Sequence, residues 1–278
     1  MTFMTRPSPG WSRRAAATSL MVLSLAACSK KADEHAPEAA HGAPAAHGGG
    51  AVQHWTYDGE TGPQHWAEMG GDNTVCATGQ RQSPIDISGP PRNLSSRLVM
   101  QYKSSLATIQ NNGHTIVVTP SDGGGIVLDG VMYTLKQFHF HSPSEHAING
   151  RSTALETHFV HQNAKGEYLI IAVLSDIGNA DPVLGSLWTY LPTDPGKPIP
   201  LPDLLVNAQD HMPGTEDFYV YSGSLTTPPC TEAATWMVYS SPLTVSSEQA
   251  DAFQRIIGPN ARPLQPRHDR DILHLSGS

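Results

Sequence analysis

Short runs rich in valine, isoleucine, threonine and aromatic residues recur between residues 115 and 239, and each run is brief. Glycine and proline, 25 and 23 residues in the whole chain, recur between them and leave little room for long helices. Brief runs of this composition, bounded by turn residues, predict β-strands. The expected strands cover residues 115–119, 125–130, 133–141, 154–162, 167–174, 218–225 and 234–239.

One helix is expected over residues 246–257, with Ser246 as its N-cap and Gly258 directly after its end. From residue 53 to residue 278 the chain has no internal repeat and no long linker. We therefore predict one mainly β, sheet-based domain over residues 53–278.

The first 27 residues have the layout of a secretory signal. Arg13 and Arg14 precede an apolar run and small residues, and the run is shorter than the ~20 residues of a membrane span. The ending Leu25-Ala26-Ala27-Cys28 resembles a bacterial lipobox, which implies a lipid on Cys28. The alternative is an ordinary signal with a chance cysteine. We expect an exported protein on the periplasmic side of the envelope, lipid-anchored at the outer membrane if the cell is Gram-negative.

Residues 28–52 are rich in alanine, glycine, proline and histidine and have no apolar periodicity, so they are expected to form a tether. Its histidines, His35, His41 and His47, could hold metal loosely or simply be solvated. The chain has a formal charge of −8, which becomes about −11 without residues 1–27. With no basic patch, nucleic acid is not an expected partner.

Residues 138–161, "FHFHSPSEHAINGRSTALETHFVH", contain five histidines. Side chains alternate between the two faces of a strand, so His139 and His141 share one face with Gln137, while Phe138 and Phe140 occupy the other. Imidazoles two residues apart on one face suit a metal. The alternative is a sheet that happens to contain histidine.

A second strand follows the turn residues Pro143 and Asn149-Gly150, with Glu156 and His158 on one face and His161 on the other. A hairpin-like return would bring His158 beside the first two histidines. Catalytic zinc sites use three protein ligands and leave the fourth position to water. We therefore predict one open zinc site per chain, with Gln137 and Glu156 as hydrogen-bond partners of the ligands.

The two cysteines that follow Cys28 are Cys76 and Cys230. Two cysteines in an exported chain predict one disulfide.

The chain resembles the α-class carbonic anhydrases from about residue 53 to residue 275. The resemblance rests on several separate motifs in the order of that family. They are residues 55–66 (WTYDGETGPQHW), 80–87 (QRQSPIDI), 111–114 (NNGH), 137–141 (QFHFH), 144–146 (SEH), 156–161 (ETHFVH), 172–174 (AVL), 221–238 (YSGSLTTPPCTEAATWMV) and 260–266 (NARPLQP).

The resemblance implies a large, twisted, mostly antiparallel sheet with a few short helices and zinc at the base of a cleft. It implies reversible hydration of carbon dioxide to bicarbonate and a proton by attack of zinc-bound hydroxide. The ligands would be His139, His141 and His158, the metal Zn²⁺, and the partners carbon dioxide and bicarbonate. A homodimer is left open, and membrane contact would be made only through Cys28.

The resemblance also assigns roles to other residues. Thr226 would accept a hydrogen bond from the hydroxide and donate one to Glu145. His114 would shuttle protons, with Tyr57 and Asn112 ordering water. The carbon dioxide pocket would be walled by Val160, Val173, Leu225 and Trp236 and bordered by Thr227.

Other interpretations remain for single residues and for the whole chain. His146 and His161 are expected to be structural histidines, and His114 could be an exposed turn residue. Ser142 and Ala234 depart from common family residues without removing a catalytic group. A recognition domain that has lost zinc is the second hypothesis, which the three retained histidines oppose, and a periplasmic zinc store is the third.

Overall fold

The computed structural model describes residues 54–276. The predicted signal peptide, the lipidation site Cys28 and the tether over residues 28–52 therefore lie outside the described residues. Within residues 54–276, no helix is long and apolar enough to span a membrane.

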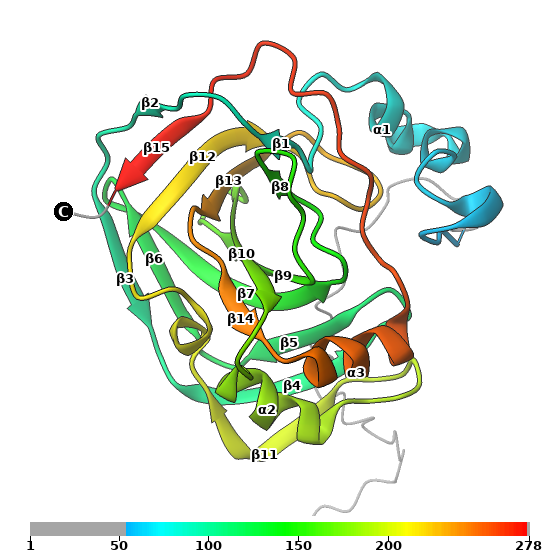
Figure 1. The fold of residues 1–278 in the computed structure, drawn as a ribbon, viewed down its shortest axis with the longest axis vertical. Coiled ribbons are helices and arrows are strands. Elements are labelled where there is room, and N and C mark those ends of the chain that lie inside the picture. The colour runs from blue at the N-terminus through cyan, green and yellow to red at the C-terminus, as the bar shows by residue number, and fades with distance from the viewer. Residues whose placement is uncertain (1–53, 277–278) are drawn as a thin grey trace, which may run out of the picture. The chain divides into compact units, whose positions relative to one another are not determined.

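A sheet of 13 strands dominates the fold and curves strongly across the molecule (Figure 1). Its strand order is β11-β4-β5-β7-β9-β10-β13-β12-β15-β2, while β3, β6 and β14 pair beside this path. In chain order these strands are β2 (Arg92–Asn93), β3 (Leu98–Tyr102), β4 (Ser105–Asn111), β5 (Ile116–Pro120), β6 (Gly124–Leu128), β7 (Val131–His141), β9 (Leu155–Gln162), β10 (Tyr168–Ile177), β11 (Ile199–Val206), β12 (Asp217–Gly223), β13 (Ala234–Tyr239), β14 (Leu243–Val245) and β15 (Leu273–Ser276).

Most strand pairs are antiparallel, which confirms the expected mainly β, mostly antiparallel fold. The parallel pairs of this sheet join β10 to β13 and β14, and β15 to β2. A separate two-stranded sheet pairs β1 (Asp86–Ile87) with β8 (Ala147–Ile148), also in parallel.

Helices are short among the described residues. The predicted helix is confirmed as α3 (Ser247–Ile257), where Ser246 Oγ accepts from Gln249 N at 3.2 Å and Gln249 Oε1 accepts from Ser246 N at 3.1 Å. This reciprocal cap satisfies two otherwise unpaired backbone donors at the helix start. The other helical segments are η1 (Gly59–Thr61), η2 (Trp66–Met69), η3 (Gly71–Thr74), α1 (Val75–Thr78), α2 (Pro182–Leu187), η4 (Trp188–Tyr190) and η5 (Ala208–His211).

The central strands separate two apolar regions because their side chains alternate between the two faces. The larger core contains Phe138, Phe140 and Phe159, all fully buried, and α3 adds Phe253 to it. The smaller cluster on the opposite face includes Trp236.

A disulfide joins Cys76 in α1 to Cys230, as predicted, with 5.1 Å between the Cα atoms. The loop before Cys230 carries Thr226 and Thr227, and Cys230 N donates to Thr227 O at 2.8 Å. The cross-link therefore fixes this loop, which lies between β12 and β13, to the N-terminal segment.

Candidate metal centre

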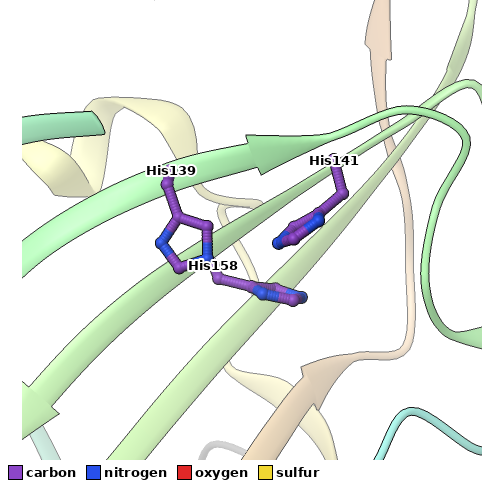
Figure 2. A group of neighbouring side chains, drawn as sticks. All are labelled: His139, His141 and His158. Atoms are coloured by element: carbon purple, nitrogen blue, oxygen red, sulfur yellow. The ribbon is translucent and has the colours of Figure 1, made fainter. Parts of the chain in front are cut away.

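Three histidines from two neighbouring strands point toward one another on one face of the sheet (Figure 2). Strand β7 supplies His139 and His141, and β9 supplies His158, which lies directly opposite His139 in the antiparallel register. The ring centroids are 5.0 Å apart for His139–His141, 5.2 Å for His139–His158 and 4.5 Å for His141–His158. One ring nitrogen from each histidine lies within 4.8 Å of the others, so a single cation could be held by all three.

The other ring nitrogen of each histidine donates to an oxygen that can only accept. His139 Nδ1 donates to Gln137 Oε1 at 2.9 Å, as the strand alternation predicts. His158 Nε2 donates to Glu156 Oε1 at 2.7 Å, which fits the Glu-x-His pattern. These bonds fix the tautomers and leave His139 Nε2 and His158 Nδ1 with free lone pairs.

The partner of His141 could not be predicted from the sequence. His141 Nδ1 donates to the main-chain oxygen of Asn260 at 2.8 Å, across 119 residues of sequence. Every residue has a main-chain oxygen, so the spacing of side chains cannot predict which one accepts from His141. In the sequence, only the family motif at residues 260–266 indicated that this segment matters. The bond leaves His141 Nε2 free to face the other two histidines.

Two buried polar atoms of the site have no hydrogen-bond partner among the described residues. They are His141 Nε2 and Glu145 Oε2, which lie 3.6 Å apart, and Glu145 Oε2 is also 3.8 Å from His158 Nδ1. Leaving a buried polar group unpaired costs about 1–3 kcal/mol, and more for a charged one. A bound cation would satisfy the histidine nitrogen, so the donor set fits a metal ion.

The protonation state of the histidines also suits a metal. Burial, reinforced by the neighbouring histidines, lowers the pKa of His139 well below its usual value. Burial likewise lowers the pKa of His141, although Glu145 opposes the shift. Metal ligation requires the neutral imidazole, and a low pKa keeps these rings neutral at ordinary pH.

Glu156 is fully buried and accepts from three donors: His158 Nε2, His146 N at 2.8 Å and His146 Nδ1 at 2.6 Å. Burial alone would raise the pKa of Glu156. Its interactions with His146 and His158 outweigh burial and hold that pKa well below its ordinary value. Glu156 therefore stays ionised and accepts hydrogen bonds.

His146 is structural, as expected, because both of its ring nitrogens have partners. Nδ1 contacts Glu156 and Nε2 lies 2.6 Å from the hydroxyl of Tyr221. His146, Glu156 and His158 also lie close enough to hold an ion, but their shared hydrogen bonds already use the relevant atoms.

The expected hydrogen bond between Thr226 and Glu145 is not formed. Glu145 Oε1 accepts instead from the main-chain N of Arg262 at 2.8 Å, and Oε2 faces the histidines. Thr226 itself is buried, with 6% of its surface exposed. Its loop neighbour Thr227 is partly buried.

His114 is held against an aromatic ring at the end of its turn. Its ring stacks on Trp55 with 3.7 Å between centroids, and its Nε2 donates to Trp55 O at 3.0 Å. Burial lowers the pKa of His114, partly opposed by that hydrogen bond. Asn112 is exposed, and its Oδ1 accepts from His114 N at 2.9 Å, so this oxygen stabilises the turn.

Tyr57 is partly buried and lies edge-on to the ring of Trp55, with 5.3 Å between centroids. Burial, and secondarily the carboxylate of Glu145, raises the pKa of Tyr57 well above its ordinary value. Tyr57 therefore keeps its proton and can donate.

An apolar wall borders the histidines on the same face. Val160 and Leu225 pack against the cluster that contains Trp236, whose ring lies 4.8 Å from that of His158. Three of the four predicted wall residues are thus together on this face.

The fourth predicted wall residue, Val173, does not lie in this wall, so that prediction was wrong. Val173 pairs with Thr157 and belongs to the large core on the opposite face of the sheet. Ile170 pairs with Val160 and takes the expected place in β10. Side chains in a strand alternate between the two faces, so an assignment that is wrong by an odd number of residues, here three, places the side chain on the wrong face.

Comparisons with known proteins agree over nearly the whole described part. A family model described as eukaryotic-type carbonic anhydrase matches residues 61–276. The chain is 40% identical over 224 residues to a carbonic anhydrase of Pectobacterium carotovorum, covering 80% of this chain and 91% of the relative. It is 38% identical over 231 residues to a carbonic anhydrase of Neisseria gonorrhoeae, covering 82% and 90%.

Solved structures give the same result. The fold is similar to the α-carbonic anhydrase of Thermovibrio ammonificans in complex with sulfanilamide, with a TM-score of 0.76, 39% identity and coverage of 79% of this chain and 98% of that one. A hyperthermostable carbonic anhydrase from a hydrothermal vent chimney gives a TM-score of 0.77, 42% identity and coverage of 80% and 100%.

Proposed function

Because this chain belongs to the eukaryotic-type, or α-class, carbonic anhydrase family, we propose that His139, His141 and His158 are the ligands of its catalytic zinc. The family reaction, zinc-dependent reversible hydration of carbon dioxide to bicarbonate and a proton, is the activity of this chain. The ligand set is supported by one observation above others. Each histidine has one nitrogen tied to an acceptor and one free nitrogen aimed at a common point.

If these residues hold one zinc ion per chain, the ion would act as a Lewis acid and lower the pKa of a bound water to about 7, a value established for carbonic anhydrases as a class. The three neutral imidazoles add no charge of their own. They therefore leave the full positive charge of the ion available to the reaction.

Thr226 and Glu145 orient the nucleophile in this proposal. A carboxylate oxygen accepts hydrogen bonds, so Thr226 would donate its hydroxyl hydrogen to Glu145. Thr226 then has only lone pairs to offer to the attacking oxygen, which turns a lone pair of that oxygen toward the substrate. This bond is not formed in the structure described above, so the proposal requires Thr226 to turn its hydroxyl toward Glu145 Oε2, which has no hydrogen bond among the described residues.

Apolar side chains hold carbon dioxide without hydrating it. Val160, Leu225 and Trp236 supply this surface, with Ile170 in place of Val173, and Thr227 borders the substrate. Carbon dioxide carries no charge, so an apolar wall binds it without a competing shell of ordered water.

His114 carries the released proton toward solvent, with Tyr57 and Asn112 ordering water along the way. Histidine is the side chain whose ordinary pKa lies near neutrality. Burial lowers the pKa of His114 in the position described here, so the proposal requires its ring to leave Trp55 O and reach solvent when it takes up the proton. The half-buried position of His114 beside an exposed turn supports this role.

We further propose that the chain is exported, cleaved before Cys28 and held to the envelope by a lipid on that residue. The signal-like residues 1–27 and the Cys76–Cys230 disulfide support export, since disulfides persist in oxidising compartments. Cys28→Ser should move the protein from the membrane fraction to the soluble fraction. Continued membrane association of that variant would count against the anchor.

The central experiment is stopped-flow measurement of carbon dioxide hydration together with zinc analysis. We expect about one tight zinc per chain, hydration that a chelator abolishes, and a Thr226→Ala variant that keeps zinc but loses kcat/KM. Several weakly bound zinc ions per chain would instead favour the zinc store. An unchanged kcat/KM in Thr226→Ala would refute the orienting role.

A further inference from the structure

The segment Asn260–Arg262 reaches the site with main-chain atoms although it belongs to no helix or strand. Asn260 O accepts from His141, and Arg262 N donates to Glu145 Oε1 at 2.8 Å. Irregular backbone has no ladder of hydrogen bonds to fix its position. Whatever anchors this segment therefore sets the direction in which the Glu145 carboxylate points.

Asn260 holds one end of the segment, where its N donates to Ser142 O at 3.1 Å and its Nδ2 donates to Phe140 O at 2.9 Å. The Arg262 side chain is the anchor at the other end, beside Glu145. It is buried, with 2% of its surface exposed, and its guanidinium lies 5.5 Å from the centroid of the Trp66 ring. Nη1 donates to Gln82 Oε1 at 2.9 Å and to Ser83 O at 2.7 Å, and Nη2 donates to Cys76 O at 3.0 Å. Hydrogen bonds from a charged donor are stronger than those between neutral groups, so these three bonds hold the guanidinium firmly in place.

The acceptors of Arg262 belong to the framework that also fixes the Thr226 loop. Cys76 is cross-linked to Cys230, and Gln82 Nε2 donates to Cys230 O at 3.1 Å. Arg262 therefore links Glu145 to the loop that carries Thr226. Its main-chain N binds Glu145, and its side chain binds the segment that the disulfide and Gln82 join to that loop.

The charge of Arg262 persists in this setting. Burial lowers the pKa of Arg262 to about 10, with Glu145 and Tyr57 opposing the shift. A pKa of about 10 still leaves the guanidinium protonated near neutral pH.

We propose that Arg262 is a positioning residue for carbon dioxide hydration, which fixes the Glu145 carboxylate relative to Thr226 by anchoring the backbone of residue 262 to the disulfide-linked frame. The proposal rests on the orienting role of Thr226 and Glu145 proposed above. It assigns Arg262 no contact with substrate.

A double-mutant cycle with amide exchange tests the proposal. Arg262→Gln should lower kcat/KM about 10- to 100-fold, the range seen when the hydrogen-bond partner of a metal ligand is removed. Arg262→Lys, which keeps the charge but loses the planar fork, should show a smaller loss in the same direction. In a Thr226→Ala background, Arg262→Gln should add less than about threefold, because the group it positions no longer acts.

Amide hydrogen exchange gives a readout independent of activity. The amide proton of residue 262 should exchange at least about tenfold faster in Arg262→Gln, in zinc-loaded and zinc-free protein alike, because its bond to Glu145 loosens. Arg267→Gln is the control, since that guanidinium bonds to Ser88 O and its Nε to Arg270 O, away from the site. The control should change neither kcat/KM nor the residue 262 amide by more than about twofold.

The outcomes distinguish the positioning role of Arg262 from the orienting role of Thr226. A folded Arg262→Gln with wild-type kcat/KM, unchanged amide exchange, or equal losses in both backgrounds overturns the positioning role. If Thr226→Ala alone keeps full activity, the orienting role of Thr226 fails, and the amide exchange still decides whether Arg262 holds Glu145. Should Arg262→Gln not fold, Arg262→Lys decides by the same two measurements, and wild-type values there overturn the proposal.

Discussion

Strand β9 presents histidines on both of its faces, and their hydrogen bonding differs. On the core face, His161 contacts the hydroxyl of Tyr102 through Nε2 at 2.8 Å and donates to Leu169 O through Nδ1 at 3.1 Å. On the opposite face, which carries His139 and His141 and is called the cleft face below, His158 has one nitrogen tied to Glu156 and the other without a hydrogen bond among the described residues. The two residues are three positions apart in one strand.

His211 repeats the core pattern. It packs beneath β9 with Nδ1 on Asp181 at 2.9 Å and Nε2 on the hydroxyl of Thr157 at 3.0 Å. His139 and His141 repeat the cleft pattern, each with a single acceptor. A buried histidine with two internal partners contributes to folding, whereas one with a single acceptor-only partner keeps a lone pair for a ligand. Counting partners separates the two kinds where burial alone does not.

Removing a cleft histidine should give the largest effect. His158→Ala takes away one of three donors, so we expect most zinc to be lost and kcat/KM to fall by about three orders of magnitude or more. His161→Ala is the matched control in the same strand. It should cost about 1–3 kcal/mol of unfolding free energy, because Tyr102 loses its partner, yet keep zinc. Full zinc occupancy and normal hydration in His158→Ala would rule out the ligand set.

Acid should destabilise the core face through His161. Burial lowers the pKa of His161 from 6.5 to about 4 in the folded protein. The unfolded chain therefore takes up the proton first as pH falls, so this contribution is intact above pH ~6.5 and is lost between pH ~6.5 and ~4. The loss amounts to about 3 kcal/mol of unfolding free energy.

His161→Gln tests this because glutamine can accept from Tyr102 and donate to Leu169 O without titrating. The comparison is urea unfolding of both proteins from pH 7 to pH 4, where the variant should have the shallower decline. Parallel curves for the two proteins would show that His161 is not the titrating group.

Weakening a ligand's partner should have a smaller effect than removing the ligand. Glu156→Gln replaces an acceptor of three hydrogen bonds with an amide that can accept through one oxygen only. We expect zinc affinity or kcat/KM to fall about 10- to 100-fold, measured by competition with a chelator and by stopped flow. Asp181→Asn is the control, since it changes the equivalent partner of His211 on the core face. Wild-type zinc affinity in Glu156→Gln would contradict the pairing.

The strand alternation in β7 was sufficient to predict which residues face the cleft. Phe138 and Phe140 are buried in the core, while His139 and His141 point to the other face, because a period of two is a local property. The cap of α3 at Ser246 was predictable for the same reason. Each of these features depends on residues within a few positions of one another.

Contacts between residues far apart in the sequence could not be predicted in this way. The acceptor of His141 is a main-chain oxygen of Asn260, and the acceptor role of Glu145 toward Arg262 N depends on an irregular segment. Strand β11 was missed because Pro200 and Pro202 argue against a strand interior. Proline is tolerated there because β11 is an edge strand of the sheet.

The error at Val173 shows which kind of information was lacking, and it leads to the prediction with the smallest effect. Ile170 and Ile171 are adjacent in β10, both buried, and lie on opposite faces. Shortening either to valine removes one methylene and should cost about 0.5–1.5 kcal/mol of unfolding free energy. Only Ile170→Val widens the pocket beside Val160, so only that variant should change kcat/KM for carbon dioxide. We expect a change of about fivefold, because one methylene in an apolar pocket is worth about 1 kcal/mol at the low end of its range.

The two variants control for each other because their stability losses should match. Thermal unfolding and stopped-flow hydration, with the hydration of both variants measured at one temperature, separate the two faces. If Ile171→Val changes kcat/KM as much as Ile170→Val does, the sheet does not divide pocket from core at this position, and the wall of the carbon dioxide site must be assigned again.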